Sequence, residues 1–326
     1  MSGFDLRAIA RELDRFSGAY VKKAYMPHYE QIVLRINPKE SDQFDLVLVR
    51  GARIYTSNRD RPMPMTPPPF AMMLRKHLKN ARMTGVRQLG FDRVLAFDFD
   101  TKFGERHLYV EVFRDGNIIL TDEEGIIIQP LTHASYSGRT LKKGVLYQPP
   151  PQALDPHEMD LETLKEMFQN SERDLVSTLG GKANLGGIHA NAVCELAGIE
   201  PNIETKQASA DKILQSLQTL LADLSSSNKG YIMLKTSDDF DNEGLAKHIV
   251  NLENNSIRDR FLEQHAIEAT PTLLPSHSKM VKMEFDSLCQ AVDAWKGAHD
   301  AGALARREAE KLDIAAPGRG FSTDVE

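Results

Sequence analysis

Four glycines lie within the eight positions 180–187, between two short runs of helical character. Glycine tolerates positive φ and lets another backbone approach closely, so this density predicts a tight two-turn connection between helices. The second helix is expected to start near Ile188, with Ile188, Val193 and Leu196 on one side and Gly198 just past its end. Its first N–H groups would lie beside an unshielded backbone, a geometry that binds phosphate. A hairpin that is glycine-rich only for close helix packing is the alternative.

Residues 185–201 resemble the helix–two-turns–helix segment of formamidopyrimidine-DNA glycosylases, where this loop grips a nucleic-acid phosphate. An asparagine of that family takes part in the contact, and this chain has Gly187 at the matching position. The resemblance therefore implies a grip by backbone amides, at Gly186 and Gly187, helped by Lys182 or Asn184.

Composition narrows the class of protein. A chain of 326 residues is long enough for two or three domains with proper cores. It has two cysteines, Cys194 and Cys289, too few for a disulfide framework or a four-cysteine zinc site. No HExxH spacing, no run of eighteen apolar residues and no signal-peptide pattern occurs. We expect a cytoplasmic protein that works without metal, cofactor or membrane.

The two halves of the chain carry opposite charge. Residues 1–150 hold 23 Lys and Arg against 17 Asp and Glu, whereas the remainder holds 17 against 29. A basic half beside an acidic half suggests a partner that binds in one orientation, and a polyanion is the usual one.

The N-terminal half is expected to form an antiparallel sheet buried on one face. Alternating apolar residues predict strands at 31–36, 44–49, 54–55, 92–99, 107–113, 117–121 and 126–128. A helix is predicted over 5–17, with Asp5 as its cap. Arg7, Arg11 and Arg15 recur on its outer face, and a solvated face relieved by Glu12 and Asp14 is favoured over a phosphate-facing row.

A second helix, over residues 70–82, follows a proline-rich connector and has Thr66 as a candidate cap. Its basic residues are Arg75, Lys76, Lys79 and Arg82, and no acidic residue occurs between Asp60 and Asp92. This lack of counter-charge favours phosphate binding over a solvated cationic face. We expect a nucleic-acid strand to lie between this basic helix and the glycine loop.

The remaining chain divides at Pro149–Pro151 and at Ser225–Asn228. Helices are predicted at 158–180 and 188–224, followed by a strand at 231–235, a charged helix from Asn242, a strand near Thr272 and a helix at 285–295. A charged helix starts at Ala301 and breaks at Pro317. The expected domains are 1–150, 157–226 and 229–300, with 301–326 as the start of a truncated coiled coil or a disordered tail.

Several N-terminal motifs resemble the NFACT family, in the family's order. They are Phe70–Leu78 (FAMMLRKHL), Gly90–Arg93 (GFDR), Tyr109–Val112 (YVEV) and Gly116–Asp122 (GNIILTD). The family comprises ribosome quality-control factors called RqcH in prokaryotes and NEMF in animals, long labelled fibronectin-binding proteins in bacteria. The resemblance implies an α+β fold: an antiparallel β domain with helices like the glycosylase N-terminal domain, an all-α helix–two-turns–helix domain, and a small α/β segment.

The resemblance also implies a function. Family members bind the large ribosomal subunit that still holds peptidyl-tRNA, and they recruit aminoacyl-tRNA, alanyl-tRNA in the prokaryotic branch, for C-terminal tailing of the stalled chain. The family's Asp-Arg pair matches Asp92 and Arg93, and its acidic residue on the first helix matches Asp5. From the residues alone, a helix cap and a surface ion pair remain the alternatives. Full-length members continue into a long coiled coil that this chain only begins.

Two other classes of protein fit the sequence less well. A DNA glycosylase of the resembling type needs an N-terminal proline amine and a four-cysteine zinc finger, and this chain begins Met1-Ser2-Gly3 with two cysteines. A fibronectin-binding surface adhesin lacks support because no signal or anchor pattern is present. No GxSxG or GxxxxGK[ST] motif occurs, so we expect a binding protein rather than an enzyme.

Overall fold

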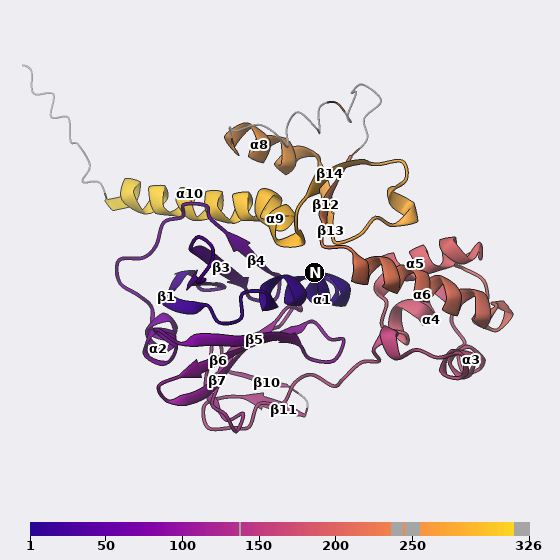
Figure 1. The fold of residues 1–326 in the computed structure, drawn as a ribbon, viewed down its shortest axis with the longest axis horizontal. Helices are drawn as coiled ribbons and strands as arrows, with labels where there is room; N and C mark the ends of the chain where they lie inside the picture. Colours follow the sequence, from indigo (N-terminus) through magenta and orange to yellow (C-terminus); the bar gives the residue numbers. More distant parts are fainter. Residues whose placement is uncertain (137, 236–243, 245–254, 316–326) are drawn as a thin grey trace, which may run out of the picture.

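A nine-stranded antiparallel sheet dominates the computed structural model, which describes residues 1–136, 138–235, 244 and 255–315 (Figure 1). Its strand order is β4-β3-β2-β1-β5-β6-β7-β8-β9. The strands are β1 (Tyr20–His28), β2 (Gln31–Asn37), β3 (Phe44–Val49), β4 (Arg53–Ser57), β5 (Arg82–Gln88), β6 (Val94–Thr101), β7 (Gly104–Glu111), β8 (Ile118–Thr121) and β9 (Ile127–Pro130). The predicted α+β class with a large antiparallel sheet is therefore confirmed.

Two central strands escaped the sequence prediction. β1 has mixed burial and includes Pro27, so its alternation is weak. β5 begins at Arg82, which was predicted to end a helix, and pairs with β6 from Arg82↔Asp100 onward. The two halves of the sheet are joined at the pair Tyr20↔Arg82, and backbone hydrogen bonds between residues 18–21 and 80–83 flank this pair. A short hairpin, β10 (Ala134–Tyr136) and β11 (Arg139–Leu141), lies beside the sheet.

Two helices border the sheet, α1 (Gly3–Asp14) and α2 (Pro69–Leu78). Ser2 caps α1, and Asp5 completes a capping box from the third helical position, so the prediction that Asp5 is the cap was wrong. α2 starts after Pro68 with Pro69 in its first turn and without a side-chain cap, so Thr66 does not cap it. The helix ends at Leu78, four residues before the predicted end.

A helical region (residues 156–226) follows the sheet region (residues 1–150). Its α-helices are α3 (Leu161–Gln169), α4 (Leu175–Gly181), α5 (Gly186–Ala197) and α6 (Ala210–Ser226), with 3-10 turns at η1 (Pro156–Glu158) and η2 (Thr205–Gln207). The two long predicted helices are thus each broken in two. α5 begins at Gly186, and Ile188 and Leu196 are exposed while Val193 is buried, so the predicted common face of these three residues was wrong.

The C-terminal region (residues 230–315) contains a three-stranded sheet, β13-β12-β14, formed by β12 (Gly230–Leu234), β13 (Ala266–Thr270) and β14 (Val281–Phe285). Its helices are α8 (Asn255–His265), the 3-10 turn η3 (Pro275–His277), α9 (Leu288–Val292), the π-helical turn η4 (Asp293–Gly297) and α10 (Ala298–Ala315). The predicted last helix therefore starts three residues late and continues directly into α10. The start of the charged helix predicted from Asn242 lies outside the described residues, and so does the break at Pro317 predicted for the helix that starts at Ala301.

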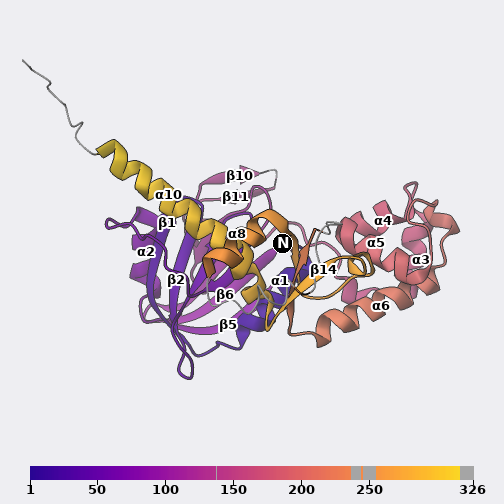
Figure 2. The same ribbon diagram turned by 90° about the horizontal axis from the view of Figure 1, so that it is seen from above.

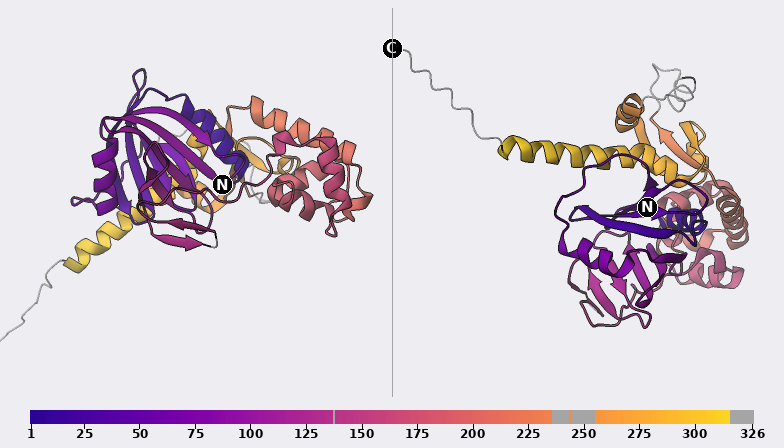
Figure 3. Two further views of the ribbon diagram at one scale, coloured as in Figure 1. Left: turned by 90° about the horizontal axis from the view of Figure 1, so that it is seen from below. Right: turned by 60° about the vertical axis from the view of Figure 1, so that its left-hand side comes forward.

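The C-terminal region docks on the sheet region, and α10 runs along the edge that carries β4 (Figure 1; Figure 3, right). The Glu12 carboxylate is buried and accepts the first backbone N–H groups of α9, from Leu288 at 2.7 Å and Cys289 at 3.0 Å. Asp300 accepts hydrogen bonds from Arg53 and from the Tyr55 hydroxyl. Glu12 thus stabilises a helix N-terminus and does not relieve a solvated arginine row.

Ion pairs at this junction also account for part of the charge asymmetry. Arg59 pairs with Asp259 at 2.7 Å and with Asp293 at 3.5 Å, and Arg53 pairs with Asp300. The basic half and the acidic half therefore neutralise each other in part within one chain, so the asymmetry by itself calls for no external polyanion. None of the helices in the described ranges combines the length and apolarity that a membrane crossing needs.

Candidate nucleic-acid interface

Three segments far apart in the sequence meet at the aromatic ring of Phe4 on α1. The Phe91 ring contacts it edge-on, with ring centroids 4.6 Å apart. The centroid of the His189 ring on α5 lies 4.3 Å from that of Phe4. α1 thus lies between the sheet and the helical region, as Figure 2 also shows. Phe91 precedes Asp92 and Arg93, so this contact brings the Asp-Arg turn, the first helix and the glycine loop together.

Two amide side chains hold the turn that carries Asp92 and Arg93. The Gln88 side chain donates to the main-chain oxygens of Gly3, at 2.9 Å, and Asp92, at 2.8 Å. Asn184 donates to the main-chain oxygen of Phe91 at 3.3 Å from the other side. Both partners are backbone atoms, so the turn is fixed to α1 and to the glycine loop whatever side chains it carries.

Asp92 and Arg93 lie at the end of the sheet, directly before β6. The Asp92 carboxylate accepts the Arg93 backbone N–H at 2.6 Å, and the Arg93 side chain is exposed. Among the described residues the two side chains form no ion pair with each other, so the surface-pair alternative is wrong for their side chains. Both residues line a cavity of about 730 Å³ that Arg114 and Tyr136 also line.

A buried carboxylate supports this cavity from below. Glu111 is fully buried, and Arg139 binds it through two hydrogen bonds of 2.6 and 3.0 Å. The Tyr147 hydroxyl donates to the same carboxylate, and burial with the nearby Glu111 charge raises the pKa of Tyr147 strongly. Arg139 also lies over the Tyr136 ring, 4.8 Å from its centroid. The Tyr136 ring, which lines the cavity, is therefore held by the ion pair between Arg139 and the buried Glu111.

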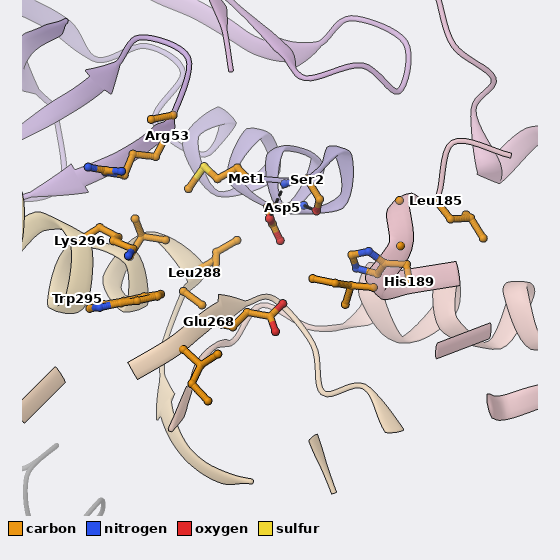
Figure 4. Close-up of a pocket in the computed structure, with 17 residues that line it drawn as sticks. Met1, Ser2, Asp5, Arg53, Leu185, His189, Glu268, Leu288, Trp295 and Lys296 are labelled. Carbon is orange, nitrogen blue, oxygen red and sulfur yellow. Dashed lines mark hydrogen bonds between the residues drawn. The ribbon is translucent and has the colours of Figure 1, made fainter. Parts of the chain in front are cut away.

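Asp5 lines a second cavity, of about 370 Å³, where the sheet, helical and C-terminal regions meet (Figure 4). Its carboxylate accepts the Ser2 backbone N–H at 2.7 Å. Removal from water raises the pKa of Asp5, and hydrogen bonds from Ser2 oppose this rise. Glu268 of β13 lines the same cavity and adds to the rise, so two carboxylates face one enclosed space.

The N-terminus of α5 forms another wall of this cavity. Gly186 has φ +70° and Gly187 follows it in the first turn; both are exposed and both line the cavity. No side chain of the described chain caps α5, and a Cβ at either glycine would meet no atom within 4 Å. The first N–H groups of α5 are thus open to a ligand, which is the geometry that the glycine spacing predicts.

Lys182 and Asn184 face other groups. The Lys182 ammonium donates to the main-chain oxygen of Asn170 at 3.0 Å, at an exposed position. Asn184 adopts φ +58° and donates to the backbone at Leu154 as well as at Phe91. Asn184 is therefore a structural link between regions in this state of the molecule, and its expected help in binding phosphate remains a prediction.

The basic residues near α2 are less uniform than their sequence suggests. Arg75 donates to the main-chain oxygen of Ala24 at 2.7 Å and lies over a tyrosine ring. Arg82 lies on β5 and pairs with Asp100, so the region does have a counter-charge, supplied by a neighbouring strand. Lys76 and Lys79 are exposed, Lys76 on the helix and Lys79 at its C-cap.

The basic helix and the glycine loop do not face each other. α2 and α5 lie at opposite ends of the molecule in Figures 1 and 2, with α1 between them. The expected clamp of one strand between these two surfaces was therefore wrong. The contacts that separate them are local: α2 packs on β1, whereas α5 packs on α4 and α6.

Two of the three arginines in the row on α1 bind protein groups and do not form a solvated face, whereas Arg15 is exposed. Arg7 donates to Gln88, to the main-chain oxygen of Gly90 and to Asp155, with which it pairs at 3.0 Å. Arg11 donates to main-chain oxygens at the C-terminal end of α6. Both residues connect α1 to the helical region, and neither alternative of the sequence analysis anticipated this role.

Sequence reasoning missed several residues that line the Asp5 cavity: His189, Glu268, Trp295 and Lys296. His189 is buried, with 5% of its surface exposed. Trp295 is the only tryptophan of the chain and ends the predicted helix. This position was the one signal available, because β13 and η4 line the cavity together with α1 from positions more than 250 residues away in the sequence.

Comparison with known proteins assigns the chain to a family. Residues 2–295 match the family model described as NFACT N-terminal and middle domains. The chain is 30% identical over 281 residues to the archaeal Rqc2 homolog aRqcH of Methanocaldococcus jannaschii, covering 80% of this chain and 42% of that protein. It is 28% identical over 329 residues to the ribosome quality control complex subunit NEMF of Homo sapiens, covering 97% of this chain and 28% of that protein. The chain thus spans less than half the length of these relatives.

A solved structure shares the fold. The N-terminal part of the fibronectin/fibrinogen-binding protein from Streptococcus suis is 25% identical, with a TM-score of 0.59, over 73% of this chain and 88% of that one. Together with the match over residues 2–295, this bears out the resemblance drawn from the FAMMLRKHL, GFDR and GNIILTD motifs. The chain belongs to the family of NFACT N-terminal and middle domains.

Proposed function

We propose that this chain is the RNA-binding part of a ribosome quality-control factor. It binds tRNA on a large ribosomal subunit that holds peptidyl-tRNA, and it recruits alanyl-tRNA for C-terminal tailing of the nascent chain. The names of its relatives support the ribosome quality-control role. The peptide bond is made by the ribosome, so the chain contributes binding and orientation only.

One observation carries the proposal: Asp5, the Asp92–Arg93 turn and the open N-terminus of α5 are joined through Phe91, Gln88 and Asn184. These are the residues that sequence reasoning assigned to RNA. The chemistry is complementary to an RNA loop. Backbone N–H groups at Gly186 and Gly187 donate to a phosphate, the exposed Arg93 side chain donates to a phosphate or a base edge, and the carboxylates accept hydrogen bonds from N–H groups of unpaired bases.

A carboxylate substitution gives a test whose sign is informative. Asp92→Asn removes a negative charge, so it should strengthen any binding that rests on electrostatic attraction to phosphate alone. If the carboxylate accepts base N–H groups, the same change should instead weaken tRNA binding by about tenfold, because one contact to a base is worth about 1–3 kcal/mol. Fluorescence anisotropy of a labelled tRNA measures this change in affinity. A labelled DNA duplex of equal charge, measured in parallel, reports the electrostatic contribution alone.

Arginine variants supply the matched comparison. Arg93→Ala should weaken tRNA binding by about tenfold, whereas Arg307→Ala removes the same charge from an exposed position on α10 and should change it less than about twofold. Equal effects of the two variants, or equally tight binding of the DNA duplex, would contradict the proposal. Tailing itself is measured in the full-length factor with the same substitutions.

A further inference from the structure

The cavity beside Asp5 has the size and the walls of a ligand site. Its volume of about 370 Å³ falls in the range of small-molecule pockets. Its walls come from four places in the chain: α1, the turn before β4, the start of α5, and the C-terminal region through β13 and η4. Figure 4 shows Asp5 and Glu268 in the middle, His189 at the α5 side, and Trp295 with Lys296 at the far side.

His189 supplies an observation independent of the helix N-terminus. Its side chain is almost fully buried, lines the cavity, and has no hydrogen-bond partner at Nε2 within the described residues. The ring makes a hydrogen bond to the backbone of Leu185, and because Nε2 has no partner in the described part of the chain, this bond belongs to Nδ1. In the neutral ring Nδ1 then carries the proton, and Nε2 is an acceptor. An orphan acceptor in a buried ring costs free energy unless a ligand donates to it. A ribose 2′-hydroxyl or an exocyclic base amine is such a donor.

Trp295 supplies the aromatic wall. It lies in the π-helical turn η4, and such turns often occur at functional sites. The Lys296 ammonium lies 3.4 Å from the Trp295 ring centroid, and both residues line the cavity. An indole beside a cation suits a nucleobase, because the base stacks on the ring while the ammonium donates hydrogen bonds to acceptor atoms of the base.

We propose that this cavity receives one unpaired nucleotide of the bound RNA, a refinement that rests on the proposed RNA-binding function. The phosphate lies at the first N–H groups of α5, and the base lies toward Trp295. His189 Nε2 accepts the 2′-hydroxyl, and Asp5 and Glu268 accept base amine hydrogens. A paired base is excluded because its hydrogen-bonding edge is occupied and because the cavity is too small for a duplex.

The single tryptophan allows a direct test. Titration with a mixed-sequence RNA hexanucleotide should quench Trp295 emission, and the same sequence in an RNA duplex should leave the emission unchanged. The 2′-deoxy hexanucleotide should bind about fivefold or more weakly, because its ribose offers His189 no donor. Quenching of equal size by duplex and single strand, or no quenching by any RNA, would overturn the nucleotide site.

Matched glycine variants block the site without touching the aromatic probe. Gly187→Leu places a side chain at the mouth of the cavity, and Gly181→Leu places one at an equally open position on α4. Hexanucleotide quenching should be lost in the first variant and kept in the second. Loss in neither or in both would overturn the assignment.

Measuring the fluorescence anisotropy of labelled tRNA in the same samples tests the nucleotide site and the tRNA-binding function separately. If tRNA binds and Trp295 emission stays constant, the nucleotide site is wrong and the RNA-binding function stands. If the hexanucleotide quenches emission and tRNA does not bind, the nucleotide site stands and the tRNA assignment fails.

Discussion

Asn184 donates its side-chain amide to the main-chain oxygen of Phe91, so the glycine loop of the helical region is tied to the residue that precedes Asp92. The same amide donates to the main-chain oxygen of Leu154 at 3.1 Å, at the start of the helical region. Asn184, whose backbone adopts φ +58°, therefore fixes the relative position of the α5 N-terminus and the Asp-Arg turn through its side chain. Any ligand that contacts both surfaces depends on this position.

Replacement of Asn184 by glycine should uncouple the two surfaces. Asn184→Gly keeps the positive φ and removes both hydrogen bonds, each worth about 0.5–1.5 kcal/mol. Asn80→Gly is the matched control, since Asn80 is exposed and has φ +61°. In urea unfolding, Asn184→Gly should cost about 1–2 kcal/mol more than Asn80→Gly, and it should weaken tRNA binding where the control does not. Equal losses of unfolding free energy in the two variants would show that the Asn184 hydrogen bonds do not stabilise the protein.

The basic residues near α2 should divide into a structural arginine and two phosphate-binding lysines. Lys76→Ala with Lys79→Ala should lower the slope of log K against log salt for tRNA by about 1.5 to 2, with no loss of thermal stability. Arg75→Ala should instead destabilise the fold by about 1–2 kcal/mol, because it removes a hydrogen bond to the backbone and a cation–π contact. The control is Lys165→Ala with Lys212→Ala, exposed on α3 and α6. An equal slope change in the control would mean that binding is diffuse.

Local patterns predicted the sheet because each strand is a short apolar run of its own. Consecutive residues of β2 and β3 are buried, so the expectation of a sheet buried on one face was wrong for these strands. The runs at 31–36, 44–49 and 107–113 lie in strands whose buried residues contact the same core. The missed strand β1 shows the limit, since its first half mixes exposed and buried side chains and its second half is half-buried throughout. Helix ends at the glycine loop were predicted to within two residues, because glycine and its φ requirement are local properties.

The site was predictable only in pieces. Asp5 and Gly187 line one cavity because Phe4, Phe91 and His189 pack together, a contact among three segments that no periodicity reports. The α1 arginines illustrate the same point. Their spacing suggested an outer face, whereas tertiary contacts give Arg11 the carbonyl end of α6 as its partner. Charge counts failed for a related reason, since a neighbouring strand supplies Asp100 to Arg82.

The docking of α10 should depend on Asp300 more than on any other acidic residue at the junction. Its carboxylate is 9% exposed and accepts from Arg53 and Tyr55, so Asp300→Ala leaves Arg53, whose side chain is 21% exposed, without this partner and should cost about 3 kcal/mol. Asp259→Ala is the control: that carboxylate is 26% exposed, and its partner Arg59 keeps Asp293. Urea unfolding measures both. A loss for Asp259→Ala as large as that for Asp300→Ala would contradict the assignment.

The buried His189 should make the stability of the protein depend on pH. Burial lowers the pKa of His189 from 6.5 to about 4, so between these values the unfolded chain binds a proton that the folded chain does not. Stability therefore falls as the pH drops from about 6.5 to about 4, by about 3 kcal/mol in full. Asp5 acts in the opposite sense, because its raised pKa favours the folded state as the pH falls toward 3.8.

The contribution of His189 is isolated by comparing variants at each pH. His189→Gln should remove most of the decrease between pH 6.5 and 4, whereas His133→Gln, at an exposed position, should leave it in place. Guanidinium unfolding at half-unit steps gives both curves. A ligand that donates to Nε2 stabilises the neutral ring further, so bound RNA hexanucleotide should shift the wild-type decrease to lower pH, whereas in His189→Gln it should raise stability without such a shift. An identical shift in both proteins would mean that the RNA does not contact this ring.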